Sequence, residues 1–128
     1  MNIEWQDSYC IDNDRIDVQH QKLFAHANAV FALKGQAGQQ LAIIQLYAHL
    51  RSHFANEEAL MREVNFPEYK SHVHLHNDML ASMNSISIAI SKNQATDDEI
   101  HKFISGWLLG HIAQEDTKIA AYVRKHAG

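Results

Sequence analysis

Apolar residues recur at helical spacing along most of this chain. They fall three or four residues apart from position 17 to Gly35, and again over about 39–64, 67–92 and 97–126. This spacing places them on one face of each α-helix, turned toward a core. Strand signals are absent, because the sequence has no Val/Ile/Thr alternation and no Asn-Gly or Asp-Gly turn. Residues expected to face inward in the first two segments are Val18, Leu23, Ala27, Val30, Phe31, Leu41, Ile44, Ala48, Phe54, Leu60 and Met61.

Capping and helix-breaking residues set the predicted ends of the four helices. Asp17 stands where it would cap the first helix, and Gly35 ends that helix. Pro67 suits the first turn of the third helix. Thr96, with Glu99 three residues later, has the sequence of a capping box for the fourth.

Four long helices with short connections predict an all-α protein, an up-down-up-down four-helix bundle. Residues 1–16 lack this periodicity and are expected to form an irregular N-terminal arm. The length of 128 residues suits a single domain, 1–128.

Composition excludes several classes of protein. The net charge is −4 with histidine neutral, and the absence of a basic run argues against nucleic-acid and anionic-membrane binding. No apolar run approaches about 18 residues, and the first residues do not have the pattern of a secretory signal, so we expect no membrane insertion. Cys10 is the only cysteine, which fits a reducing compartment. A cytoplasmic protein is therefore expected.

Ten histidines are many for this length, and five of them have metal-ligand spacing. In His-x-x-x-Glu and His-x-x-x-His, two ligands lie one turn apart on one helical face. One such pair is common by chance, but here all four helices contribute. Five imidazoles and two carboxylates exceed the needs of one metal ion and suit two metals held between helices. The candidate ligands are His20, His53, Glu57, His72, His76, His111 and Asp116.

Counting coordination positions predicts an opening at this site. Two six-coordinate ions have twelve positions; two bridging carboxylates fill four, a bridging oxygen atom fills two and five histidines fill five. One position stays open, and beside two redox-active metals it can receive a small molecule, whereas a structural site would be closed. Imidazole and carboxylate without thiolate favour iron or manganese. The high share of neutral imidazole disfavours high-valent iron and favours reversible binding over oxidation.

Five histidines fall outside this pattern. His49 competes with it, because it lies one turn before a candidate ligand on the same face. His74 is expected on the solvent side of its helix, and His126 complements the dipole at a helix C-terminus. His26 and His101 have no ligand-spaced partner, so we expect neither to bind metal.

One ligand pair has an awkward spacing. His111 and Asp116 are five residues apart, which leaves them roughly 140° apart around a regular α-helix. Glu115, four residues from His111, has the better helical geometry. Either Glu115 is the ligand or a local π-bulge brings Asp116 into register.

The same residues resemble the motifs of bacterial hemerythrins in order, identity and spacing, over essentially the whole chain. The matching segments are Trp5, Ile16-Asp17-x-x-His20, His53-Phe54-x-x-Glu57-Glu58, Met61, Phe66-Pro67…His72-x-x-x-His76 and Trp107-Leu108-x-x-His111-Ile112-x-x-x-Asp116. The resemblance implies a non-haem centre of two iron ions, with a bridging oxo or hydroxo group, that binds dioxygen reversibly. It also implies that one iron is held by His72, His76 and His111. The other iron, which has the vacant position, is then held by His20 and His53, and Glu57 and Asp116 bridge the two ions.

Apolar residues near these ligands are candidates for the wall of an oxygen pocket. They lie within about a turn of ligands from three helices and would admit dioxygen while excluding water and protons. The alternative is that they are ordinary bundle core. The residues are Leu23, Phe54, Trp107, Leu108 and Ile112.

At three positions this chain differs from the pattern that the resemblance to the family implies. Ile119 stands where many relatives have a tyrosine that hydrogen-bonds near the bridging glutamate. The loss of this hydrogen bond would alter the redox potential or the rate of autoxidation. Leu75 replaces a glutamate before a ligand histidine, and Asp12 replaces a glycine in the arm. None of the three is a candidate ligand.

Three functional hypotheses follow. The leading one is reversible dioxygen binding for storage, delivery or scavenging by a monomer without catalytic turnover, with an oxygen-consuming enzyme as a candidate partner. The second is a module that senses oxygen, nitric oxide or redox state through a separate partner protein. The third is a di-iron peroxidase or ferroxidase, and the inert side chains of Leu23, Ile112 and Ile119 argue against it.

Overall fold

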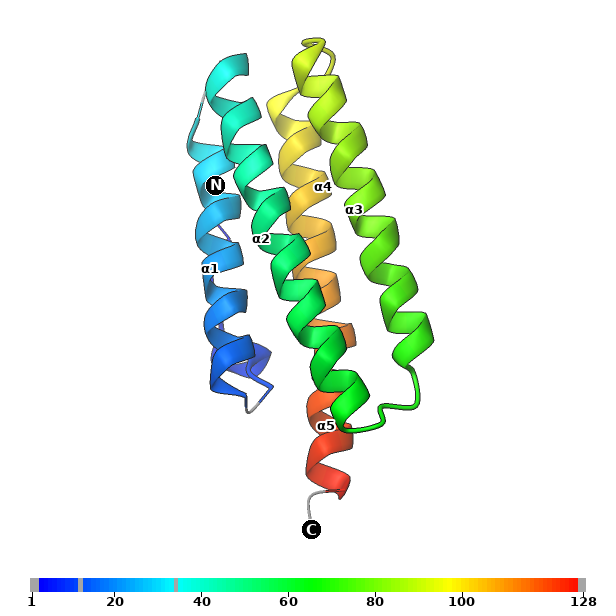
Figure 1. Ribbon diagram of the computed structural model, residues 1–128. Helices are drawn as coiled ribbons and strands as arrows, with labels where there is room; N and C mark the ends of the chain where they lie inside the picture. The colour runs from blue at the N-terminus through cyan, green and yellow to red at the C-terminus, as the bar shows by residue number, and fades with distance from the viewer. Residues whose placement is uncertain (1–2, 12, 34, 127–128) are drawn as a thin grey trace.

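Four antiparallel helical segments form the body of the protein in the computed structural model (Figure 1), which describes residues 3–11, 13–33 and 35–126. The chain runs up, down, up and down through the bundle, and the described residues contain no strand. This confirms the predicted all-α bundle. Its elements are α1 (Asp14–Ala32), α2 (Gln36–Glu63), α3 (Tyr69–Ser91), α4 (Asp97–Gly110), the π-helical segment η2 (His111–Asp116) and α5 (Thr117–His126).

The N-terminal arm is irregular, as predicted, with one short 3-10 turn, η1 (Asp7–Tyr9). Its backbone is tied to α1 in two places. The Asn28 side chain pairs with the backbone of Ile3 at 2.8 and 2.9 Å, and the Ile11 amide donates to Asp17 Oδ1 at 2.8 Å. The arm therefore covers the α1 side of the bundle.

Two predicted helix starts differ from the structure. Asn13, and not Asp17, caps α1, because its side chain accepts from the Ile16 amide at 3.1 Å. Pro67 precedes α3, which begins two residues later. The capping box of Thr96 and Glu99 at the start of α4 is present as predicted.

The buried face of α2 is rotated from the predicted one over its first half. Leu41 and Ile44 are 60% and 53% exposed, and Ala48 is also exposed. The buried residues there are Ala42, Ile43, Leu46 and Leu50. Apolar residues occupy every position from 41 to 44, so spacing alone does not select a face. In α1, Val18 is likewise exposed instead of buried.

Apolar packing encloses the middle of the bundle from both ends. A large cluster that includes Leu46, Met83 and Ile104 fills the end near the α1–α2 connection. A smaller cluster of Met61, Phe66 and Ile119 closes the other end. The buried histidines lie between these two clusters together with Glu57 and Asp116, where few water molecules can reach them.

None of the helices among the described residues combines the length and apolar character needed to cross a membrane.

The large apolar cluster supplies much of the stability of the bundle, and two isoleucines test this. Ile104 is fully buried, so Ile104→Ala should lower the free energy of unfolding by about 2–5 kcal/mol. The matched change Ile44→Ala, at a side chain that is 53% exposed, should shift it by less than about 0.5 kcal/mol. Urea unfolding followed by circular dichroism measures both; equal losses would contradict the difference in burial between the two side chains.

Candidate metal centre

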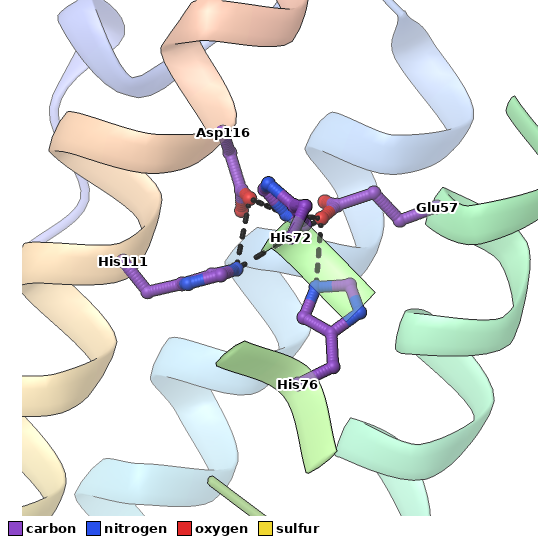
Figure 2. Close-up of side chains that lie close together, drawn as sticks. All are labelled: Glu57, His72, His76, His111 and Asp116. Atoms are coloured by element: carbon purple, nitrogen blue, oxygen red, sulfur yellow. Dashed lines mark hydrogen bonds and ion pairs between the residues drawn. The ribbon is translucent and has the colours of Figure 1, made fainter. Parts of the chain in front are cut away.

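All seven predicted ligands are buried and converge in the middle of the bundle. They come from four segments that are distant in the sequence: α1, α2, α3 and η2. Figure 2 shows five of them, with the side chains from α3 and η2 pointing at the carboxylate from α2. Their donor atoms form two sets, and within each set all atoms lie within 4.8 Å of one another. One set is Glu57, His72, His76, His111 and Asp116, and the other is His20, His53, Glu57 and Asp116.

The two oxygens of Glu57 face different histidines. Oε1 lies 2.6 Å from His72 Nε2 and 3.0 Å from His76 Nε2 (Figure 2). Oε2 lies 3.2 Å from His53 Nε2 and 3.5 Å from His20 Nε2. One carboxylate therefore spans two groups of histidines.

Asp116 divides its oxygens in the same way. Oδ1 lies 3.0 Å from both His72 Nε2 and His111 Nε2, and Oδ2 lies 2.9 Å from His20 Nε2. The histidines thus form two groups: His72, His76 and His111 are the three-histidine group, and His20 and His53 are the two-histidine group. Each carboxylate places one oxygen against each group. This is the arrangement in which a carboxylate bridges two cations.

Many of these polar atoms have no hydrogen-bond partner although they are fully buried. Leaving such atoms unsatisfied costs free energy, and native proteins rarely do so. The contacts of His20 and Asp116 are short, but their geometry is not that of a hydrogen bond. Neutral imidazole and carboxylate donors that share one buried space fit two metal cations. The unsatisfied atoms are His20 Nδ1 and Nε2, His53 Nε2, Glu57 Oε2, His111 Nε2, and Asp116 Oδ1 and Oδ2.

The pKa values show how strongly this space attracts positive charge. Burial would raise the pKa of Glu57, but the histidine nitrogens that surround its carboxylate, His111 first, hold it well below its usual range. Burial would lower the pKa of His20 and His72, but the adjacent carboxylates of Asp116 and Glu57 raise both to about 9. Without metal, protons on these histidines supply the positive charge that cations would otherwise supply.

The π-helical segment η2 brings His111 and Asp116 together. In this segment residues five apart lie near one another, and His111 Nε2 is 3.0 Å from Asp116 Oδ1. Glu115, the alternative from regular helical spacing, is turned outward and pairs with Lys118 at 3.1 Å. Spacing alone favoured Glu115; only the π-bulge alternative and the family resemblance pointed to Asp116.

The candidate pocket residues are all at least partly buried. Leu23, Phe54, Leu108 and Ile112 are buried, and Trp107 is half-buried. Two of the aromatic rings stack on histidines of the three-histidine group. The ring centroids of Phe54 and His76 are 3.8 Å apart, and those of Trp107 and His111 are 4.5 Å apart. The two rings of each pair are nearly parallel.

The histidines outside the pattern stay out of the cluster. His49, the competitor, stacks on His26 across the α1–α2 interface, with ring centroids 3.9 Å apart. His74 is 76% exposed and pairs with Asp78 at 3.3 Å. His101 packs against the ring of Phe31. His126 lies in the last turn of α5, as expected.

The three departures from the family pattern have different settings. Ile119 is fully buried against Met61 and Phe66. It therefore makes an apolar contact where the resemblance implies that a tyrosine of many relatives makes a polar one. Leu75 is half-buried on α3. Asp12 lies outside the described residues.

Two further side chains, neither of them a predicted site residue, contact the cluster from outside. Gln19 Oε1 lies 2.8 Å from His53 Nδ1, and Glu58 Oε2 lies 2.8 Å from His76 Nδ1. Each is adjacent in sequence to a predicted ligand. For Gln19 that adjacency was the only available signal, and Glu58 also stands in the matching motif; the contacts themselves depend on how the helices are rotated against each other.

Comparisons with known proteins show the family to which the chain is similar. Residues 12–123 match the family model described as the hemerythrin HHE cation binding domain. The chain is 34% identical to a hemerythrin-like protein of Naegleria gruberi over 89% of its own length and 87% of the relative. It is 28% identical to a bacteriohemerythrin of Stenotrophomonas maltophilia over 95% of its length and 82% of the relative. A myohemerythrin of Riftia pachyptila is 29% identical, with 89% and 88% covered.

A solved crystal structure of a leucine-to-phenylalanine mutant has the same fold. The TM-score is 0.83, with 93% of this chain and 95% of that chain covered, at 18% sequence identity.

Metal content distinguishes the buried His53 from the competitor His49. His53→Ala removes a donor from the two-histidine group and should cost the protein one metal equivalent. His49→Ala, four residues earlier on the same helix, should leave metal content unchanged because its ring contacts His26 and not the cluster. Anaerobic loading with Fe(II), followed by metal analysis of folded protein, measures both. Loss of a full equivalent from His49→Ala would place His49 among the ligands.

The metal-free protein should lose stability as the pH rises from about 6.5 to about 9. The raised pKa values of His20 and His72 stabilise the fold fully below the unfolded value near 6.5, and that contribution is lost as the pH passes the folded values of about 9. The loss should reach at most roughly 1.4 kcal/mol per pH unit for each histidine. Urea unfolding over this range measures it. His74→Ala, at an exposed position, should keep the same slope, and a flat profile in the unchanged chain would contradict the expectation.

Proposed function

This chain belongs to the hemerythrin family, and we propose that its buried cluster holds two iron ions that bind dioxygen reversibly. The observation that carries the proposal is the division of oxygens in Glu57 and Asp116, each of which faces both histidine groups. The cluster has the donor count and the shared carboxylates that a pair of bridged ions requires.

The residues have separate roles in this proposal. Glu57 and Asp116 bridge the two ions, together with an oxo or hydroxo group. The three-histidine group, His72, His76 and His111, holds one ion, and the two-histidine group, His20 and His53, holds the other. When both ions are ferrous, the pair can lend two electrons to dioxygen and recover them on release. The ion with fewer protein donors has room for the gas.

The side chains around the cluster limit access by water. Leu23, Phe54 and Ile112 are almost completely buried and lie close to ligands in the sequence. Ile119 closes the opposite end of the cluster with Met61 and Phe66. Apolar walls admit dioxygen but exclude the water and protons that would turn reversible binding into loss of peroxide. The proposed oxygen pocket consists of Leu23, Phe54, Trp107, Leu108 and Ile112.

We propose binding without catalytic turnover. A peroxidase or ferroxidase needs an acid or base that moves protons at the open position. The side chains of Leu23, Ile112 and Ile119 cannot do so. The single cysteine suits the reducing cytoplasm. We propose that the protein is a monomer that stores, scavenges or delivers dioxygen to an oxygen-consuming enzyme.

A visible-absorption cycle tests reversible binding. The iron-loaded protein is reduced without oxygen, exposed to air, and then purged with argon. We expect a colour that develops in air and disappears on purging over several cycles, because the buried site protects both ions from water. Protein loaded with Zn(II), which has no redox chemistry, is the control and should stay colourless. Oxidation in air that argon does not reverse would contradict the proposal.

A further inference from the structure

Two histidines of the cluster direct their outer ring nitrogens at side chains of different charge. His76 Nδ1 lies 2.8 Å from Glu58 Oε2, and His53 Nδ1 lies 2.8 Å from Gln19 Oε1. Both partners accept, so each ring donates through Nδ1–H and keeps the lone pair of Nε2 for the cluster. His76 belongs to the three-histidine group and His53 to the two-histidine group.

The two contacts are alike in length but differ in charge. A carboxylate that accepts from a ligand imidazole gives the ring partial anionic character and makes it a stronger donor to metal. A neutral amide orients the ring equally well but adds no charge. Stronger donation favours ferric over ferrous iron, because the ion of higher charge gains more from it.

The surroundings of His53 preserve this difference. Gln19 lines a hollow of about 190 Å³ between α1 and α2, together with Lys22, His49 and Ser52. No carboxylate is among the residues that line this hollow. The outer side of His53 is therefore neutral or cationic, whereas His76 has the carboxylate of Glu58, whose side chain is only 22% exposed.

We propose, on the basis of the di-iron assignment above, that Glu58 and Gln19 are positioning residues that make the two iron sites unequal. Glu58, through His76, favours ferric iron in the three-histidine group. Gln19, through His53, favours ferrous iron in the two-histidine group. When a chemical reductant gives one electron to the diferric protein, that electron goes to the ion held by His20 and His53. This is the ion with room for dioxygen.

Two charge-changing substitutions test the proposal by anaerobic redox titration. Glu58→Gln keeps an acceptor for His76 but removes the charge, so the second one-electron reduction should become easier. Gln19→Glu adds a charge behind His53, so the first reduction should become harder. Each variant thus narrows the gap between the two steps. A tenfold change in the ferric-to-ferrous preference corresponds to a shift of about 59 mV for one electron.

Mössbauer spectra of the half-reduced protein assign each effect to one ion. Glu58→Gln should alter the ferric doublet and Gln19→Glu the ferrous doublet. Glu63→Gln is the matched control, since this exposed glutamate lies on the same helix, and it should change neither doublet nor potential. Glu58→Ala removes both the charge and the hydrogen bond. If Glu58→Ala shifts the potential while Glu58→Gln does not, the carboxylate only orients the ring and the proposal is overturned.

These measurements use no dioxygen, so they fail independently of the proposed function. A protein that holds both ions and shows the expected potentials, yet is oxidised irreversibly by air, contradicts reversible binding and supports the asymmetry. A protein that binds dioxygen reversibly but shows unshifted potentials in both variants contradicts the asymmetry alone.

Discussion

The burial of two carboxylates among five imidazoles is the constraint on which the rest of this structure depends. Glu57 and Asp116 are completely buried, with apolar clusters on both sides along the bundle axis. Such charges are tolerated only where cations or protons offset them. The raised pKa values of His20 and His72 show that protons do so when metal is absent. Metal ions take over this role when they bind, and their binding free energy then adds to that of folding.

The fourth helical segment meets this constraint with a local change of helix geometry. A regular α-helix would turn Asp116 away from His111 and place Glu115 in the cluster. Widening to a π-helix over six residues turns Asp116 inward and leaves Glu115 at the surface with Lys118. Such segments replace the i→i+4 hydrogen bonds of the α-helix by i→i+5 bonds, and they occur often at functional sites. Here the gain is a second carboxylate that reaches both histidine groups.

The sequence predicted the bundle and most of the cluster because both depend on spacing along single helices, whereas Asp116 followed only from the family resemblance or from a π-bulge that regular spacing does not require. His53 and Glu57, or His72 and His76, share a face wherever the helix lies. Relations between helices were less predictable. The run from Leu41 to Ile44 is apolar in every phase, so only packing in three dimensions shows that Ile43 faces inward. Asp17 ties down the arm instead of capping α1 for the same reason: its partner, the Ile11 amide, belongs to another segment.

The shared carboxylates also couple the two metal positions. A cation beside His72 and His76 would fix Glu57 through Oε1, and this would hold Oε2 where His53 and His20 present their nitrogens. Removing one cation leaves an oxygen of each carboxylate buried without a partner, which is costly in this apolar setting. The two positions therefore gain from being filled together. The chain can still distinguish the two metal positions through contacts that they do not share. These are the contacts of Glu58 with His76 and of Gln19 with His53, on the outer side of each histidine.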